Sequence, residues 1–155
     1  MLFRSQSNNR IRKVDGTGTI TTIAGTGTGG FTGDGAAATL AQINTPRGVA
    51  VDGSGNVYFV DRFNERIRRI DGGTNIITTV AGNGTAGYLA DGVVATTTRI
   101  NGARGLCVDG SGNIYIADRG NNRVRRIDAI TDIITTVAGN GTGGFAGDEI
   151  GRAHV

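Results

Sequence analysis

The chain has 155 residues, of which 19% are charged, and a formal net charge of +3. This charge is too small for a protein that binds nucleic acid mainly through charge. The single cysteine excludes an internal disulfide, and no run of 18 apolar residues predicts a membrane span.

A repeat of 57 residues organises the chain. Residues 47–91 align without a gap onto residues 104–148, with 30 of 45 positions identical. An incomplete third copy precedes them, since residues 7–15 match 63–71 and residues 21–25 match 78–82. A period of this size indicates a supersecondary unit that buries its apolar face against its neighbours.

The two ends depart from the repeat. The copies predict Asp at position 5 and Gly at position 149, where Ser5 and Glu149 stand. Residues 1–5 and 149–155 are similar to translations of the adapters used in short-read DNA sequencing. We therefore expect both ends to be scars outside the fold, and residues 6–148 to be a piece of a longer repeat array.

Each full copy contains four short runs that are typical of β-strands. In the first full copy these runs are GVAVD at 48–52, NVYFVD at 56–61, RIRRID at 66–71 and IITTVAG at 76–82. DGSGN at 52–56 predicts a tight hairpin turn. No window shows a sustained helical period, so the chain is predicted to be all-β.

The stretch PRGVAVDGSGNVYFVDRFNERIRRID at 46–71 and its second copy resemble NHL repeats, and the Gly-rich segment that follows resembles a bacterial subtype of them. The resemblance implies a β-propeller in which each repeat forms a four-stranded antiparallel blade. It predicts a partial propeller arc of about two and a half blades. The expected parts are an outer half-blade at 6–25 and full blades at 47–82 and 104–139, joined by long inter-blade segments.

Strands that alternate in direction place the loops of an arc on two faces. One face is expected to carry the turns at 52–56, 71–75, 109–113 and 128–132. The other is expected to carry the turns at 62–65 and 119–122 and the inter-blade segments 26–46 and 83–103. The copies differ most on this second face, and variable loops on a fixed frame are common binding sites. We predict that it binds a protein, a carbohydrate or a small molecule through Arg62, Phe63, Arg119 and Asn122.

A second set of polar residues recurs at the same turns, namely Asp61, Asn64 and Arg66 with their copies Asp118, Asn121 and Arg123. As a functional set, these side chains would ring an opening and suit an anionic or peptide partner. We favour a structural lattice instead. In this lattice Asp61 pairs with Arg66, and Asp118 with Arg123, across the turn.

Other patterns are interpreted as turns and loops with a structural role, and no metal or cofactor is predicted. The DGSGN turns lack the bidentate acid that completes a calcium site, and the Gly-rich runs lack the Lys-Ser/Thr of a phosphate loop. The arginines at 66, 68 and 69 have too few aromatic neighbours in the sequence to stack RNA bases. Cys107 is expected to be a small buried residue, like its counterpart Ala50.

The sequence therefore favours a binding scaffold that is not an enzyme. Residues 6–148 contain no histidine to accept a proton from serine, and the histidine metal ligands of the NHL-like amidating lyase have no counterpart in them. The alternatives are a piece of such a lyase whose catalytic blades lie elsewhere, and an NHL module that binds nucleic acid. The subtype resemblance and the low Lys content predict a parent protein outside the cell or at its surface. The open ends of the arc predict a marginal fold for the isolated chain, which is either poorly cooperative and aggregation-prone or stabilised by self-association.

Overall fold

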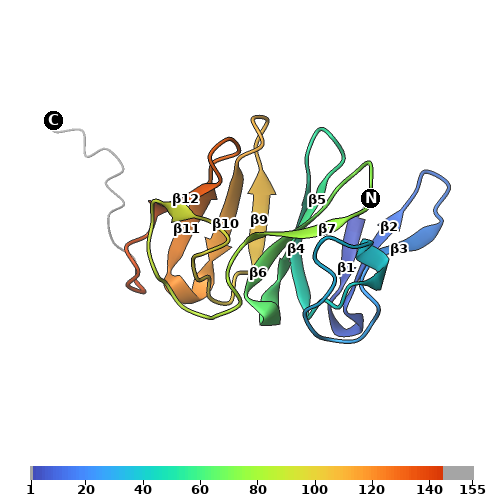
Figure 1. Cartoon of the computed structure of the whole chain (residues 1–155), viewed down its shortest axis with the longest axis horizontal. Coiled ribbons are helices and arrows are strands. Elements are labelled where there is room, and N and C mark those ends of the chain that lie inside the picture. The colour runs from blue at the N-terminus through green and yellow to red at the C-terminus, as the bar shows by residue number, and fades with distance from the viewer. Residues whose placement is uncertain (1, 145–155) are drawn as a thin grey trace, which may run out of the picture.

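The structure is a computed structural model that describes residues 2–144, with side chains from residue 7 onward. These residues form three antiparallel sheets that stand side by side and are joined by long segments (Figure 1). The prediction of an all-β, partial propeller arc is confirmed. The expected scar at 149–155 lies outside the described residues.

The second and third sheets are complete four-stranded blades. The second sheet consists, in order, of β4 (Pro46–Val51), β5 (Val57–Asp61), β6 (Arg66–Ile70) and β7 (Ile77–Ala81). The third consists of β9 (Gly105–Val108), β10 (Ile114–Asp118), β11 (Arg123–Ile127) and β12 (Ile133–Ala138). A two-residue strand that the sequence did not predict, β8 (Val93–Val94), pairs with the outer edge of β12. The strands of the second sheet lie within two residues of the predicted runs.

The first sheet has three strands and begins at Leu2, before the bounds of 6–25 that were expected for the half-blade. Its strands are β1 (Leu2–Ser5), β2 (Arg10–Val14) and β3 (Ile20–Ala24). β1 pairs with β2 from Leu2↔Lys13 to Ser5↔Arg10, although we expected residues 1–5 to lie outside the fold. Strand pairing uses main-chain groups, so an extended segment next to an open edge can pair whatever its side chains are.

Short 3-10 turns connect the second and third strand positions of every blade. They are η1 (Gln6–Asn8), η3 (Arg62–Asn64) and η4 (Arg119–Asn121), and a fourth such turn, η2 (Ala38–Leu40), lies in the first inter-blade segment. The residue after each blade turn is left-handed, with φ of 49° at Asn9, 47° at Glu65 and 49° at Asn122. Asn tolerates this conformation well, and Glu65 holds it through contacts described below.

The hydrophobic core lies in the two spaces between neighbouring sheets. Alternation along β5 sends Val57 and Phe59 toward the first sheet and Tyr58 and Val60 toward the third. The cluster between the first two sheets includes Ile11, Ala24, Phe59, Ile70 and Ile77. The cluster between the last two includes Val60, Ile67, Ile116, Ile127 and Ile134. Each blade therefore depends on its neighbours for burial, as the repeat predicted.

Cys107 is exposed, so the expectation of a buried cysteine is wrong. Its neighbours Leu106 and Val108 pack into the core between the second and third sheets, and alternation turns Cys107 to the opposite face of β9. The counterpart Ala50 is partly buried, because it lies on the face of the second sheet that the third sheet covers. Exposure thus follows from position in the arc.

The inter-blade segments are ordered along the outer edge of the following blade. In the first segment the amide of Gly35 donates to the carbonyl of Ile77 (2.8 Å), and the amide of Ile77 donates to the carbonyl of Ala36 (3.0 Å). In the second segment the amide of Gly92 donates likewise to Ile134 (2.9 Å). These segments therefore extend the sheets.

The turns lie on two faces of the arc, as predicted (Figure 1). We call the edge with the turns 15–19, 52–56 and 109–113 the turn face, and the edge with η3, η4 and the Gly-rich parts of the inter-blade segments the long-loop face. The amide of Gly72 donates to Asn56 Oδ1 (3.0 Å), which brings turn 71–75 to the turn face. Asn64 Nδ2 donates to the carbonyl of Gly30 (2.7 Å), which joins η3 to the first inter-blade segment. Between residues 2 and 144, no helix is long and apolar enough to cross a membrane.

Candidate functional site

A buried carboxylate stands where the second strand meets the 3-10 turn in both full blades. Asp61 is 0% exposed and accepts hydrogen bonds from the amide of Asn44 (2.7 Å) and from Asn64 Nδ2 (2.8 Å). Its copy Asp118 accepts from the amide of Asn101 (2.8 Å) and from Asn121 Nδ2 (2.8 Å). These bonds tie the turn to the inter-blade segment, a contact that the sequence analysis did not predict for Asp61 and Asp118.

Burial raises the pKa of Asp61 and of Asp118. The hydrogen bonds from Asn64 and from the Asn44 amide oppose this rise for Asp61 but do not cancel it. The same balance holds for Asp118, with the Asn101 amide and Asn121 in the opposing role. A carboxylate engaged this fully has little capacity left for a ligand.

The sequence analysis paired each buried aspartate with the wrong arginine. Asp61 forms its ion pair with Arg68 (3.2 Å), and Arg66 donates instead to the carbonyls of Asn64 (3.0 Å) and Asn83 (2.9 Å). Arg66 and Arg68 lie two residues apart on β6, and Arg68 is the one whose side chain is fully buried. A buried guanidinium needs a counter-charge more than one near solvent, so it takes the carboxylate.

The third blade shows the same change of arginine partner. Asp118 approaches Arg125 (3.7 Å), and Arg123 donates to the carbonyl of Asn140 (2.9 Å). The structural set predicted from the sequence is therefore completed by Arg68 and Arg125, which the prediction left out.

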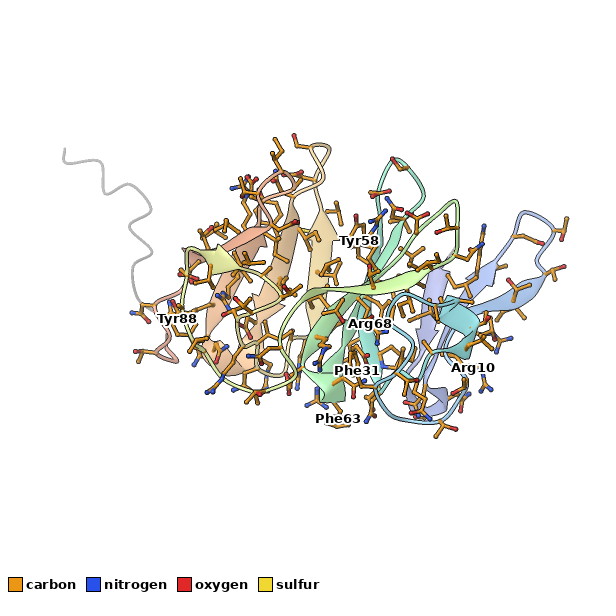
Figure 2. The ribbon with its side chains drawn as sticks, viewed as in Figure 1. Arg10, Phe31, Tyr58, Phe63, Arg68 and Tyr88 are labelled. Atoms are coloured by element: carbon orange, nitrogen blue, oxygen red, sulfur yellow. The ribbon has the colours of Figure 1, made fainter. Side chains whose placement is uncertain are left out.

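An aromatic residue and an acid from each inter-blade segment cover these arginines. The Phe31 ring centroid lies 3.8 Å from Arg66 Cζ and 4.8 Å from Arg68 Cζ, and Asp34 forms an ion pair with Arg68 (2.9 Å). Figure 2 shows Phe31 beside Arg68 on this face. The cation–π and ionic contacts together hold the segment against β6.

Tyr88 and Asp91 repeat this arrangement in the next segment. The Tyr88 centroid lies 4.3 Å from Arg123 Cζ and 5.1 Å from Arg125 Cζ, and Asp91 pairs with Arg125 (3.1 Å). The signal in the sequence was an aromatic residue three positions before an Asp in each Gly-rich segment. The inter-blade segments were predicted as loops, and no contact between them and an arginine was predicted.

Arg62 and Phe63 lie together on η3 at the long-loop face. Phe63 is 58% exposed, and Arg62 Cζ lies 4.6 Å from its ring centroid. The side-chain Nε of Arg62 is buried and has no hydrogen-bond partner in the described part of the chain. Of the predicted binding residues, these two form the one cluster that we describe as a candidate site.

The copies of these residues on η4 differ. Arg119 is exposed, and position 120, the counterpart of Phe63, is Gly120. A Cβ atom at Gly120 would come within 2.5 Å of the Asn101 side chain, so no larger residue fits there without a shift. The third blade thus has an arginine at this turn, with no aromatic partner for it among residues 7–144.

Asn122 occupies a position that bridges blades elsewhere in the chain. Its counterparts are Asn9, whose Oδ1 accepts from the Thr45 amide (2.9 Å), and Glu65, whose Oε2 accepts from the Gly102 amide (2.8 Å). Burial raises the pKa of Glu65, and the bond from Gly102 opposes that rise. Asn122 itself is exposed and donates from Nδ2 to the carbonyl of Gly141 (3.3 Å), so the binding role that the sequence predicts for it stays a prediction.

In the DGSGN turns, the aspartate accepts hydrogen bonds from residues of its own hairpin. Asp52 Oδ1 accepts from the amides of Ser54 and Asn56 (both 2.9 Å), and Oδ2 accepts from Asn56 Nδ2 (2.7 Å) and the Tyr58 hydroxyl (3.1 Å). Partial burial raises the pKa of Asp52, but these hydrogen bonds outweigh it and lower the pKa overall. Across residues 2–144, no group of three or more His, Cys, Asp or Glu side chains is placed to hold a metal ion.

Two family models match the chain. The model of the Teneurin NHL domain matches residues 29–89, and the model of the NHL repeat matches residues 101–127. NHL repeat-containing protein 2 of Bos taurus is 32% identical over 97 residues, which cover 61% of this chain and 13% of that protein. Teneurin-1 of Mus musculus is 39% identical over 100 residues, which cover 61% of this chain and 4% of that protein.

A solved structure is similar over most of the chain. It is a structural genomics protein of unknown function from Bacteroides thetaiotaomicron, with a TM-score of 0.67 and 27% identity. The match covers 75% of this chain and 29% of the other. The chain therefore spans a small part of each of these proteins.

Proposed function

Because the chain belongs to the NHL-repeat β-propeller family, we propose that it is a non-catalytic scaffold whose long-loop face binds a segment of a partner protein. The observation that supports this proposal is the exposed Arg62–Phe63 pair. Phe63 is 58% exposed on a face where the neighbouring acids and arginines are engaged within the fold. An exposed aromatic residue beside an arginine is a common anchor of protein interfaces.

The surrounding surface indicates the chemistry of the partner. The inter-blade segments expose part of Phe31, Tyr88 and Leu89, at 39%, 39% and 54%. Arg66 and Arg123 lie against the two rings. A segment with apolar and acidic side chains would complement such a surface, since it offers apolar area and positive charge together.

The nucleic-acid alternative loses support from the way the arginine run is used. Arg68 is buried with Asp34 and Asp61, and Arg69 pairs with Asp71 (2.7 Å). Arg66 and Arg68 share the Phe31 ring, and the side chain of Arg68 is fully buried. The run is therefore divided between structural contacts, and a continuous basic stripe would be needed to follow a phosphate backbone.

A peptide-display selection on the immobilised chain tests the proposal. We expect enriched peptides to combine aromatic or aliphatic residues with Asp or Glu. Their affinity should fall at least about tenfold for the Arg62→Ala, Phe63→Ala double variant, since anchor residues carry most of the energy of such interfaces. The matched control is Ile130→Ala, which removes an apolar side chain that is 93% exposed in a turn on the opposite face.

The proposal fails if the enriched peptides bind the double variant as well as they bind the original chain. It also fails if Ile130→Ala weakens their binding to the same extent. Circular dichroism of each variant shows whether the fold is retained, so that a loss of binding is assigned to the surface.

A further inference from the structure

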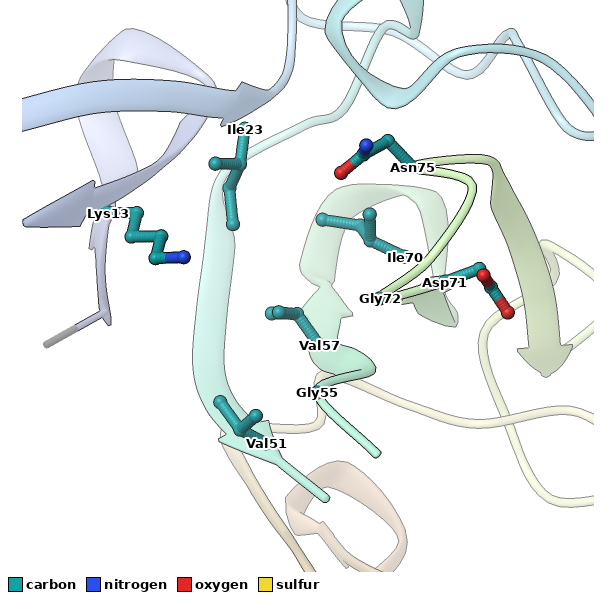
Figure 3. Close-up of a pocket in the computed structure, with 9 residues that line it drawn as sticks. All are labelled: Lys13, Ile23, Val51, Gly55, Val57, Ile70, Asp71, Gly72 and Asn75. Carbon is teal, nitrogen blue, oxygen red and sulfur yellow. The ribbon is translucent and has the colours of Figure 1, made fainter. Parts of the chain in front are cut away.

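A pocket of about 200 Å³ opens on the turn face between the first and second sheets. Figure 3 shows Ile23 of the first sheet opposite Val57 and Ile70 of the second, with Lys13 and Asn75 beside them. Val57 and Ile70 are almost fully buried, at 7% and 2% exposure. The pocket thus has an apolar floor, and its polar groups stand at the rim.

A second pocket of about 220 Å³ lies between the second and third sheets, at the equivalent place. Val80, Ile114 and Ile127 take the places of Ile23, Val57 and Ile70. The pocket is therefore a product of the repeat, and it recurs at both junctions between blades. The two copies differ at their rims, so one serves as an internal reference for the other.

The basic residue at the rim is engaged in one pocket and available in the other. Arg69, at the second pocket, donates to Asn56 Oδ1 (2.9 Å) and pairs with Asp71 (2.7 Å). Lys13, its counterpart at the first pocket, is exposed, and its ammonium group has no hydrogen bond or ion pair with any side chain from residue 7 to residue 144. An ammonium group on a flexible stem can reach an anion at the rim.

The acid at the rim of the first pocket is already satisfied. Asp71 Oδ1 accepts from the amides of Gly73 (3.1 Å) and Thr74 (2.9 Å), and Oδ2 accepts from Arg69. Hydrogen bonds from the amide and the hydroxyl of Thr74 lower the pKa of Asp71, and the amide of Gly73 and the positive charge of Arg69 add to this effect. Asp71 is therefore engaged by its own turn and by Arg69, and the Lys13 ammonium is the rim charge without a side-chain partner from residue 7 to residue 144.

The two pockets also differ at the next rim position. Asn75 in the first pocket is replaced by Asp132 in the second. The Asn75 amide group can donate hydrogen bonds to an anion, and its side chain has no hydrogen-bond partner among the described residues. When it is ionised, the Asp132 carboxylate has no hydrogen to donate, and its negative charge repels an anion.

We propose that the first pocket binds a short aliphatic carboxylate. The hydrocarbon chain lies against Ile23, Val57 and Ile70, and the carboxylate binds the Lys13 ammonium and the Asn75 amide at the rim. A water molecule occupies about 30 Å³, so the pocket holds on the order of seven atoms or groups of that size. This volume suits a chain of about four to six carbons. The site lies on the face opposite the proposed protein-binding surface and is independent of it.

Saturation-transfer and methyl NMR of the full chain with sodium hexanoate test the proposal. We expect hexanoate to shift the methyl signals of Ile23, Val57 and Ile70 and to leave those of Ile114 and Ile127 in place. Hexan-1-ol, which has the same chain without the charge, should bind at least about tenfold more weakly, since a hydrogen bond to a charged group is stronger than one between neutral groups.

Three substitutions distinguish an effect on ligand binding at the rim from an effect on folding. Lys13→Met and Asn75→Asp should each weaken hexanoate at least about tenfold, and Asp132→Asn should leave its affinity at the first pocket unchanged. Asn75 and Asp132 both have left-handed backbones, with φ of 59° and 57°. Either residue type is thus compatible with this turn, so the exchanges test charge and not folding.

The proposal is overturned if hexanoate and hexan-1-ol bind equally, or if Asn75→Asp keeps the affinity. It is also overturned if the shifts appear at Ile114 and Ile127, because the second pocket would then be the site. Loss of the methyl shifts in both Lys13→Met and Asn75→Asp, with Asp132→Asn unaffected, is the result that supports it.

Discussion

Two buried guanidinium groups determine the polar contacts at the junctions between blades. Arg68 has 0% side-chain exposure and contacts Asp34 (2.9 Å) and Asp61 (3.2 Å). Arg125 is equally buried and contacts Asp91 (3.1 Å) and Asp118 (3.7 Å). Each guanidinium thus has one acid from its own blade and one from the preceding segment, which links the segment to the blade.

Removing one of these acids tests the arrangement. We expect Asp61→Ala to lower the free energy of unfolding by about 3 kcal/mol, because it leaves the Arg68 guanidinium buried with less counter-charge. Arg66→Met, at the arginine that the sequence analysis had paired with Asp61, should cost about 1 kcal/mol, since it removes hydrogen bonds to carbonyls nearer the surface. Urea denaturation of both variants measures the two losses. Equal losses would contradict the assignment of Arg68 as the partner of Asp61.

At the scale of elements, the turn-face hairpins are held by aspartates that bind their own turns. Asp128 repeats Asp71: its Oδ1 accepts from the amides of Ile130 (3.1 Å) and Thr131 (3.0 Å), and Oδ2 pairs with Arg126 (2.8 Å). Hydrogen bonds from the amides of Thr131 and Ile130 lower the pKa of Asp128. These turns therefore favour the ionised form of the acid.

The lowered pKa values predict a loss of stability in acid. A carboxyl with a lowered pKa binds fewer protons in the folded state than in the unfolded state, so stability falls as the pH drops below the unfolded value of about 3.9. We expect the Asp71→Asn, Asp128→Asn double variant to lose less stability between pH 5 and pH 3 than the original chain. Asp61 and Asp118 have raised pKa values and act with the opposite sign, so they offset part of the loss. Urea denaturation at several pH values measures the difference, and parallel pH profiles for the two proteins would refute the role of these turns.

At the scale of the whole molecule, the outer face of the third sheet differs from the equivalent face of the second. Val124 and Val137 are 38% and 50% exposed, whereas Ile67, the counterpart of Val124, is 0% exposed beneath the third sheet. Cys107 lies on the same outer face. The third sheet therefore presents an apolar face that a neighbouring blade covers elsewhere in the arc.

This exposed face predicts self-association of the isolated chain. We expect the sedimentation coefficient to rise with protein concentration, and the Val124→Lys, Val137→Lys double variant to remain monomeric, because charge on this face opposes its burial. Ile130→Lys, at a residue 93% exposed in a turn, is the matched control and should associate like the original chain. A concentration-independent monomer before any substitution would show that the face needs no cover.

The sequence by itself determined the blades. Val57, Phe59 and Val60 lie in a run of β-branched and aromatic residues bounded by turn residues, and the 57-residue repeat shows the same run again at 114–118. Strand formation depends on such local patterns, so the strands and the two faces of the arc could be predicted. The first strand, Leu2–Ser5, could not, because it pairs through main-chain groups at an open edge and its side chains carry no repeat signal.

Only the tertiary structure decided which side chains meet. Arg66 and Arg68 have the same chemistry and lie on the same face of β6, and depth of burial selects Arg68 as the partner of Asp61. Cys107 is exposed and Ala50 is partly buried at the same repeat position, because a neighbouring sheet covers only one of them. The pocket beside Lys13 likewise forms between two sheets. Burial and pairing depend on neighbours distant in the chain, and local sequence patterns do not contain that information.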